Sequence, residues 1–282
     1  MKEMLAMKSK HGDFSDDDNS IFKKNMIAAI VLIAIFIVGG FIGYSNYKVR
    51  SSRVSIDKTT LCPSEENISR YTSILVDVTN NINHIQKESL NKYFENLKLN
   101  LLEHEKITIF VVNNESVNNI KPKLTLCNPG NQIKSQFTEN EGIILKRWEE
   151  EFNKPLSKTF DEIVTGGESD VSPIFEMIQG ASINGFPTKT KDTPKRLYII
   201  SDMLHHTDGF SLYKQNPNFS DLKASSYYHH IKTNMDNAEV TLLLIYRSGF
   251  EKFQNKTLIR NFWEPYFKEQ GARLIEAAAV EG

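Results

Sequence analysis

The chain has 282 residues, of which 34 are basic and 35 acidic, and its formal net charge is −1 at pH 7. This length accommodates one large domain or two small ones, and 40% hydrophobic with 24% charged residues describe a folded protein rather than a disordered one. The near-neutral charge gives no electrostatic basis for binding nucleic acid, which requires a strongly basic face.

The first residues and the segment after them differ sharply in polarity. Residues 1–25 form an acidic tail with three consecutive aspartates and few apolar side chains, so we expect this tail to be disordered. Residues 26–46 follow as a predicted transmembrane helix, because Met26–Tyr44 contains 19 residues and no charge. A buried core helix would show a polar face, and the apolar region of a signal peptide is usually only about 7–15 residues long. We therefore expect an uncleaved single-pass anchor.

The orientation of this anchor is not fixed by charge. Basic residues stand on both sides of the apolar run: Lys23 and Lys24 before it, and Lys48, Arg50 and Arg53 after it. A short tail inside the cell and a large exported domain are the commoner arrangement. We expect the protein to lie in the cell (inner) membrane with its large domain outside the cytoplasm.

The region behind the anchor contains both cysteines of the chain. Residues 47–69 are polar and lack periodicity, which predicts a linker. Cys62 and Cys127 lie in similar settings, LCPSE and LCNPG. An even count is compatible with one disulfide in an oxidising compartment, which would favour export. The alternative is two unrelated small apolar residues near strand ends.

From Tyr71 onward, short apolar runs alternate with amphipathic stretches, which predicts one α/β domain over residues 70–282. The predicted strands are TSILVDV (72–78), Lys106–Val112, Lys123–Cys127, Arg196–Ser201, Glu239–Tyr246 and Ala272–Ala277. The first predicted helix carries the apolar stripe Leu90, Phe94, Leu97 and Leu101. A second covers about Glu141–Ile163, and a third starts with Ser172 as its N-cap and Pro173 at the first helical position. Two more cover about Asp221–Met235 and Thr257–Gln270. Apolar strands separated by helices predict a mostly parallel sheet with helices on both faces and the short third strand as an antiparallel edge.

Three polar clusters follow predicted strands or precede a predicted helix. In open α/β sheets, ligands bind beyond the carboxyl ends of the strands. The clusters are Asp77, Thr79 and Asn81, the loop GGESDVS (166–172), and Ser201 with Asp202.

Together, these clusters and the order of elements resemble the von Willebrand factor A domain, also known from integrin I domains, over about residues 71–277. The resemblance implies a metal-ion-dependent adhesion site of the form Asp-x-Ser-x-Ser, completed by a loop Thr and an Asp after the fourth strand. Asp77 and Asp202 match the two Asp positions, whereas the hydroxyl positions are substituted. The residues at those positions are Thr79 and Asn81 in place of the two Ser and Ser169, with Asp170 beside it, in place of the Thr; Met203 stands where a Gly is usual.

Oxygen ligands of this kind suit Mg²⁺ or Mn²⁺. Such a metal would accept a carboxylate from a protein partner, which makes the site a binding device. The alternative is that Asp77 and Thr79 cap the first helix, that Ser169 and Ser172 cap another, and that no ion binds.

No motif of nucleophilic or phosphate chemistry is present, since the sequence lacks G-x-S-x-G, GK[ST] and C-x-x-C. Adjacent histidines diverge in a strand or helix, so the pairs His205–His206 and His229–His230 are interpreted as loop residues. We therefore expect a protein-binding module in a membrane complex and no enzyme. The alternatives are a metal-dependent α/β hydrolase built on Asp77, Asp202 and His205, and a structural component with a vestigial metal site.

Overall fold

The computed structural model describes residues 16–51, 55–112, 120–130, 141–165, 171–187, 192–213 and 217–280. The chain divides into two compact units, one ending at Val54 and one beginning at Ser55.

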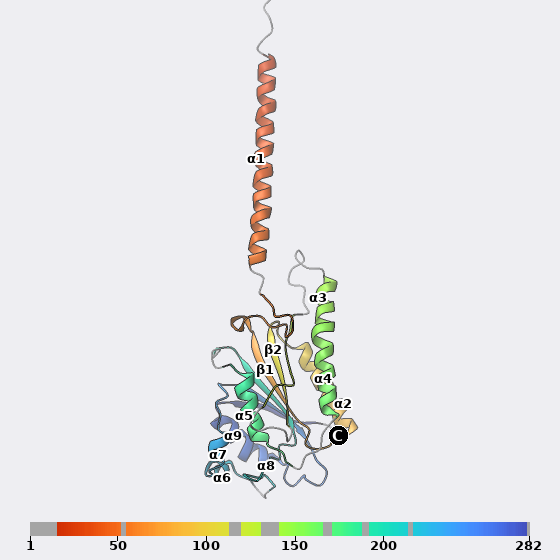
Figure 1. Ribbon diagram of the computed structural model, residues 1–282, viewed down its shortest axis with the longest axis vertical. Coiled ribbons are helices and arrows are strands. Elements are labelled where there is room, and N and C mark those ends of the chain that lie inside the picture. The colour runs from red at the N-terminus through yellow and green to blue at the C-terminus, as the bar shows by residue number, and fades with distance from the viewer. Residues whose placement is uncertain are drawn as a thin grey trace, which may run out of the picture. The chain divides into compact units, whose positions relative to one another are not determined.

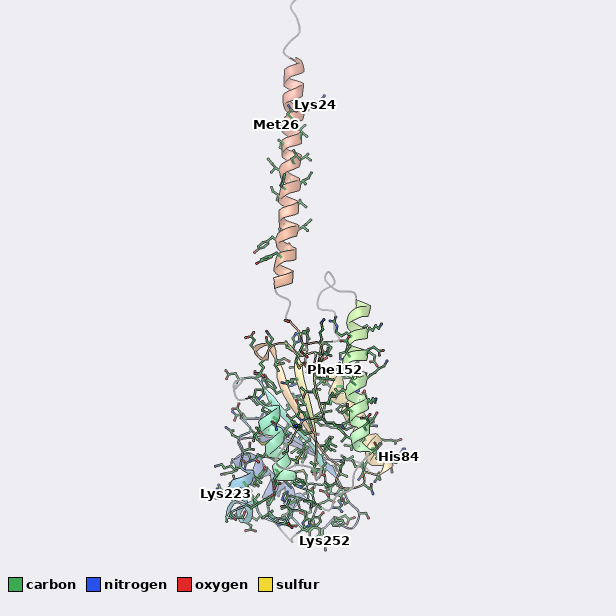
Figure 2. The ribbon with its side chains drawn as sticks, in the orientation of Figure 1. Lys24, Met26, His84, Phe152, Lys223 and Lys252 are labelled. Atoms are coloured by element: carbon green, nitrogen blue, oxygen red, sulfur yellow. A yellow bond between two sulfur atoms is a disulfide. The ribbon has the colours of Figure 1, made fainter. Side chains whose placement is uncertain are left out.

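In the first unit, the described residues form one long helix, α1 (Asp16–Ser51). It starts within the segment expected to be a disordered tail, because extending an existing helix adds one hydrogen bond for each residue fixed. Within it, Lys24–Ser45 is long and apolar enough to cross a membrane, with a mean hydropathy of 2.8, a property that signal sequences share. The residues of this span from Lys24 to Tyr44 are exposed on all sides of the helix (Figure 2).

The second unit is built on a six-stranded sheet in the order β3-β2-β1-β4-β5-β6. Neighbouring strands run parallel, except that β3 is antiparallel to β2. The predicted mostly parallel sheet with an antiparallel third strand is therefore confirmed, with small shifts at the strand ends. The strands are β1 (Arg70–Asp77), β2 (Glu105–Val112), β3 (Leu124–Cys127), β4 (Lys195–Ser201), β5 (Glu239–Ile245) and β6 (Arg273–Val280).

Helices cover both faces of this sheet (Figure 1). One face carries α5 (Ile174–Gly185), α6 (Phe219–Lys223), α7 (Tyr228–Ile231) and the continuous run of α8 (Lys256–Leu258), π-helical η3 (Ile259–Trp263) and α9 (Glu264–Glu269). The other carries α2 (His84–Leu99) and the continuous run of α3 (Glu141–Arg147), π-helical η2 (Trp148–Asn153) and α4 (Lys154–Val164). A short 3₁₀ turn, η1 (Glu65–Asn67), precedes β1.

Strand β1 lies between these two cores and is buried along its whole length. Tyr71 and Leu75 belong to the core on the α5 face, whereas Ile74 and Val76 belong to the core on the α2 face. This alternation follows from the two-residue period of a strand. A strand of a parallel sheet that is buried on both sides thus supplies both cores at once.

Two predicted helix details are wrong. The helix expected over about Asp221–Met235 is split into α6 and α7, and the Ser225 hydroxyl donates to the Leu222 carbonyl at 2.6 Å in the turn after α6. Serine side chains compete for backbone groups in this way and favour turns. The N-cap of α5 is Pro173 rather than Ser172, because Ser172 pairs with His206 in a β-bridge.

The linker expected over residues 47–69 is also shorter than predicted, because the second unit begins at Ser55. Leu61 and Ile68 are buried in the two cores of the domain, and Ile56 pairs with Pro63 in a β-bridge. Isolated apolar residues in a polar stretch carry no periodicity, so the sequence pattern did not indicate this packing.

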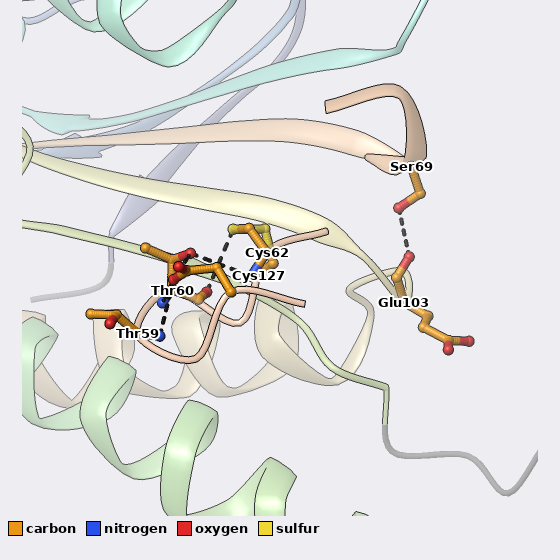
Figure 3. Close-up of a disulfide and its surroundings, with 7 residues drawn as sticks. Thr59, Thr60, Cys62, Ser69, Glu103 and Cys127 are labelled. Atoms are coloured by element: carbon orange, nitrogen blue, oxygen red, sulfur yellow. Dashed lines mark hydrogen bonds between the residues drawn. A yellow bond between two sulfur atoms is a disulfide. The ribbon is translucent and has the colours of Figure 1, made fainter. Parts of the chain in front are cut away.

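A disulfide joins Cys62 to Cys127, whose Cα atoms are 4.8 Å apart (Figure 3). The Cys127 amide also donates to the Thr60 carbonyl at 2.8 Å. The loop before Cys62 is shaped by Asp57, whose carboxylate accepts hydrogen bonds from the amides of Thr59 and Thr60 at 3.0 and 2.7 Å. The segment that precedes β1 is therefore fixed covalently to the edge strand β3.

Replacing both cysteines, Cys62→Ser with Cys127→Ser, should destabilise the domain. The bridge closes a loop with a sequence separation of 65, and removing a crosslink of that span lowers the free energy of unfolding by about 2–4 kcal/mol. Urea unfolding of the full chain in detergent micelles measures the change. Lys58→Ala, at an exposed position of the same loop, serves as the control and should leave the midpoint unchanged. Equal midpoints for the double variant and the wild type would contradict the prediction.

Candidate functional site

Asp77, the last residue of β1, is 5% exposed and accepts four hydrogen bonds. Its Oδ1 accepts from the amide and hydroxyl of Thr79 at 3.0 and 2.7 Å. Its Oδ2 accepts from the hydroxyls of Ser172 at 3.2 Å and Ser201 at 2.7 Å. The donors come from the turn after β1, the loop before α5 and the end of β4. Asp77 therefore holds three segments together at the carboxyl edge of the sheet.

The helix that follows β1 has a cap of its own. The N-cap of α2 is Asn83, whose side chain accepts from the Gln86 amide at 2.9 Å, while the Gln86 side chain accepts from the Asn83 amide at 3.1 Å. This reciprocal pair is a capping box. The alternative in which Asp77 and Thr79 cap the first helix is therefore wrong.

Asp202 follows β4 and is 4% exposed. Its Oδ2 accepts from Asn80 Nδ2 and Arg247 Nη1, both at 3.1 Å, and its Oδ1 accepts from the Leu204 amide at 2.8 Å. Burial and the negative charge of Asp77 raise the pKa of Asp202 to about 7, although the Leu204 amide and Arg247 act in the opposite direction. The two predicted aspartates thus come together, and a guanidinium lies beside one of them.

Arg247 is a residue of this candidate site that the sequence reasoning missed. Its Nη1 donates to Asp202 and also to the Tyr213 hydroxyl at 2.6 Å, and its guanidinium carbon lies 4.1 Å from the centre of the Phe250 ring. Its amide donates to the side chain of Gln254 at 2.8 Å. One signal could have found it, because it directly follows the predicted fifth strand, at the edge where the polar clusters were sought.

A cleft of about 770 Å³ opens at this edge of the sheet. Amide, hydroxyl and aromatic side chains line it together with Arg247, and no Asp or Glu of the described residues does so. Asp77 and Asp202 lie beneath its surface. The lining residues are Thr79, Asn80, Asn81, Asn83, Gln86, Ser172, His206, Tyr213, Tyr246, Arg247, Ser248 and Phe250.

Of the predicted metal ligands, the structure places Asp77, Thr79, Asn81 and Asp202 at this edge, and Ser169 lies outside the described residues. These residues do not fit a metal ion as they are arranged. Both oxygens of Asp77 are taken by hydroxyl and amide donors, and Asp202 is already paired with a cation. No group of three or more His, Cys, Asp or Glu side chains in the described ranges is placed to hold a metal. Binding of Mg²⁺ or Mn²⁺ stays a prediction that requires Arg247 to leave Asp202.

His205, the histidine of the alternative hydrolase, is fully buried and does not line the cleft. Its Nδ1 accepts from the Phe175 amide at 3.5 Å, and its Nε2 lies 3.2 Å from the Thr207 hydroxyl and 3.1 Å from the Tyr227 hydroxyl. Burial, with a smaller effect of His206, lowers the pKa of His205 to about 3. The neutral ring is thus a packing element on the α5 face, and His206 is the member of the pair that reaches the cleft.

No protein-family model and no curated protein sequence matches the chain. Among solved structures, the chain is similar to the von Willebrand factor A domain of SpRpn10, with a TM-score of 0.36 and 14% identity over 76% of this chain and 90% of that one. With similarity at this level, the fold assignment rests on the strand order, the antiparallel third strand and the helices on both faces. The fold is von Willebrand factor A-like.

In this von Willebrand factor A-like domain, Met203 has a backbone conformation that is typical of glycine. Met203, which stands where a Gly is usual, has a φ of +59°, a left-handed conformation that glycine adopts most readily. Its amide donates to the Ser201 hydroxyl at 2.8 Å, and its carbonyl accepts from the Trp263 indole at 3.2 Å. The Met203 side chain is fully buried. Core packing and these two hydrogen bonds therefore hold a non-glycine residue in a glycine conformation.

His205→Gln should make the domain less sensitive to acid. Because the pKa of His205 is about 3 in the folded state and about 6.5 when unfolded, the unfolded chain binds more protons between these values. Wild-type stability is therefore lost as the pH falls from about 6.5 towards 3, and the loss at pH 4.5 is on the order of 2 kcal/mol.

Urea unfolding of the full chain at pH 7 and pH 4.5 gives the free energy of unfolding of the wild type and of His205→Gln. The change with pH in the difference between the two proteins measures the contribution of His205. The comparison is needed because Glu176, with Oε2 4.0 Å from His205 Nδ1, has a pKa raised by burial. Its contribution is present at low pH and lost as the pH rises, which is the opposite sign. A stability difference that is the same at both pH values would contradict the assignment of a neutral buried His205.

Proposed function

We propose that the chain is a single-pass membrane-anchored module that binds a protein partner through the cleft at the carboxyl edge of its sheet. The observation that carries this proposal is the lining of the cleft. Tyr213, Tyr246 and Phe250 lie there beside Arg247, and tyrosine, phenylalanine and arginine are enriched in protein interfaces. The mixture of these side chains with amides and hydroxyls fits a protein surface.

The cleft also has a framework that holds its side chains in place before a partner arrives. Asp77 and Asp202 are buried beneath it and accept hydrogen bonds from Thr79 and Ser172 and from Arg247. Side chains that are already ordered lose less conformational entropy on association. This preorganisation supports a binding role.

The same hydrogen bonds count against a hydrolase. The hydroxyls of Thr79 and Ser172 both donate to Asp77, so neither is paired with a histidine that would act as its base. His206 lines the cleft, but its Nδ1 lies 2.9 Å from the Ser211 hydroxyl. In the described part of the chain, the cleft therefore presents groups that bind rather than a nucleophile with its base.

The N-terminal helix supplies the membrane attachment in this proposal. Its span Lys24–Ser45 has the length and hydropathy of a transmembrane segment, and we propose that it stays uncleaved in the cell (inner) membrane. The Cys62–Cys127 disulfide supports a domain outside the cytoplasm, because disulfides persist in oxidising compartments and are rare in the cytosol.

Trapping thiols in intact cells tests this location. After acid quenching and denaturation, a maleimide–polyethylene glycol reagent should leave the mobility of the full chain unchanged, because Cys62 and Cys127 are bonded to each other. Prior reduction, as the control, should let both cysteines react and shift the band. Two reactive thiols without reduction would place the domain in a reducing compartment.

Tyr246→Ala should weaken partner binding. Tyr246 lines the cleft and is 37% exposed, and truncating an aromatic anchor of an interface costs about 1 kcal/mol or more, which is about fivefold or more in affinity. The measurement is the amount of each protein retained by the full chain from detergent-solubilised native membranes, determined by quantitative mass spectrometry.

The matched control is Ile183→Ala, which removes an exposed apolar side chain from α5, 65% exposed and outside the cleft. Retention should be unchanged for this variant. If the wild type retains no protein specifically, the binding proposal fails and the structural component with a vestigial site becomes the better account.

A further inference from the structure

Of the three guanidinium nitrogens of Arg247, one is engaged by described residues of the domain. Nη1 makes both internal hydrogen bonds, to Asp202 and Tyr213. Nε and Nη2 have no hydrogen-bond partner among the residues that the structure describes. The side chain is 23% exposed and lines the cleft. The edge of the guanidinium formed by Nε and Nη2 is therefore available to a ligand.

This edge has the geometry of a two-pronged donor. The N–H groups of Nε and Nη2 on one side of a guanidinium are parallel and match the two oxygens of a carboxylate. The ring of Phe250, 4.1 Å from the guanidinium carbon, and the hydroxyl of Tyr213, 2.6 Å from Nη1, fix the plane and rotation of the group. Because it is already oriented, the fork loses little entropy when a ligand binds.

The charge at the cleft surface points to an anionic ligand. The described lining residues include no Asp, Glu or Lys, and Arg247 supplies a positive charge. The two carboxylates below, Asp77 and Asp202, are only 5% and 4% exposed and have their own hydrogen-bond donors. The Tyr213 hydroxyl accepts from Arg247, so its own proton remains for an incoming oxygen.

We propose that Arg247 binds an Asp or Glu side chain of the partner protein directly, with no metal ion between them. This inference rests on the proposed function and adds the chemistry of the partner. The cation beside Asp202 is a side chain of the protein itself.

Two features favour a protein carboxylate as the anion. The fork offers one bidentate contact, and no lysine or second arginine lines the described part of the cleft to meet the additional charge of a phosphate. The tyrosine and phenylalanine rings around Arg247 would bury the aliphatic stem of the partner's Asp or Glu. Burial of that stem would also shield the ion pair from water and strengthen it.

The test is retention of the partner by the full chain from detergent-solubilised native membranes, with EDTA and with millimolar Mg²⁺. Wild-type retention should be the same in both conditions. Arg247→Lys should reduce retention about tenfold or more, because lysine is a point charge without a fork. Lys252→Gln should not, since Lys252 lies outside the cleft and contacts Phe253.

Arg247→Lys keeps a cation beside Asp202, so it is the variant expected to stay folded. Arg247→Gln alone would leave the buried carboxylate of Asp202 without its cation, which is strongly destabilising. The double variant Arg247→Gln with Asp202→Asn removes both charges and should also lose the partner. Thermal melting of each variant in detergent establishes that the loss occurs in folded protein.

A photo-crosslinking residue in place of Ser248, which is exposed at the cleft, identifies the partner segment. That segment should contain an Asp or Glu whose replacement by Asn or Gln weakens retention as much as Arg247→Lys does. The two changes combined should add little to either alone, since both remove one interaction.

The outcomes separate the two levels of the proposal. A partner retained in Mg²⁺ and lost in EDTA, or retained equally by wild type and a folded Arg247→Lys, would overturn direct carboxylate binding while leaving the protein-binding function in place. A wild type that retains no protein overturns the proposed function, and this inference with it.

Discussion

The architecture of the cleft depends on the burial of Asp77 at the end of the central strand. A carboxylate removed from water must have its lone pairs satisfied, and here hydroxyl and amide donors from three segments meet that requirement. Ser172 donates to Asp77 and pairs with His206 instead of capping α5, while Ser201 is oriented so that it also accepts from the Met203 amide. The shape of the whole edge follows from this one buried group.

Asp202 and Arg247 form a second layer above it. A second buried carboxylate beside the first is costly, and the guanidinium offsets that cost from the cleft side. Because Arg247 is held by Asp202 and Tyr213 through a single nitrogen, the stabilising contact and the ligand-facing edge belong to different atoms. The same residue can therefore serve the fold and the surface without competition between the two.

Sequence reasoning succeeded where the signal was local. Apolar strands such as the one ending at Asp77 can be recognised in the sequence by their length and their β-branched residues. A polar residue at the carboxyl end of such a strand must lie at the edge of the sheet where ligands bind. Sequence reasoning failed where several neighbouring residues are all suited to the same position, here the N-cap of a helix. Thr79, Asn80, Asn81 and Asn83 are all reasonable helix caps, and only the backbone path selects Asn83.

Arg247 could not be assigned to the candidate site from the sequence, for a different reason. Its contacts with Asp202 and Tyr213 span 45 and 34 residues, and nothing in the sequence around it shows which partners its long side chain will reach. The two cysteines were easier, because the chain has only one pair to form. Their placement next to Thr60 and on the edge strand still came from the fold.

The disulfide has a mechanical consequence if, as proposed, the chain is attached at one end to a bilayer. A pulling force that reaches the domain from its N-terminal side passes from Cys62 across the sulfur bridge to Cys127. The chain between these residues, which includes β1, α2 and β2, is a closed covalent loop and cannot be extended by that force. The covalent path from Cys62 to the rest of the chain thus bypasses the loop that contains the central strand, and the bridge limits how far the N-terminal side of the domain can be drawn out.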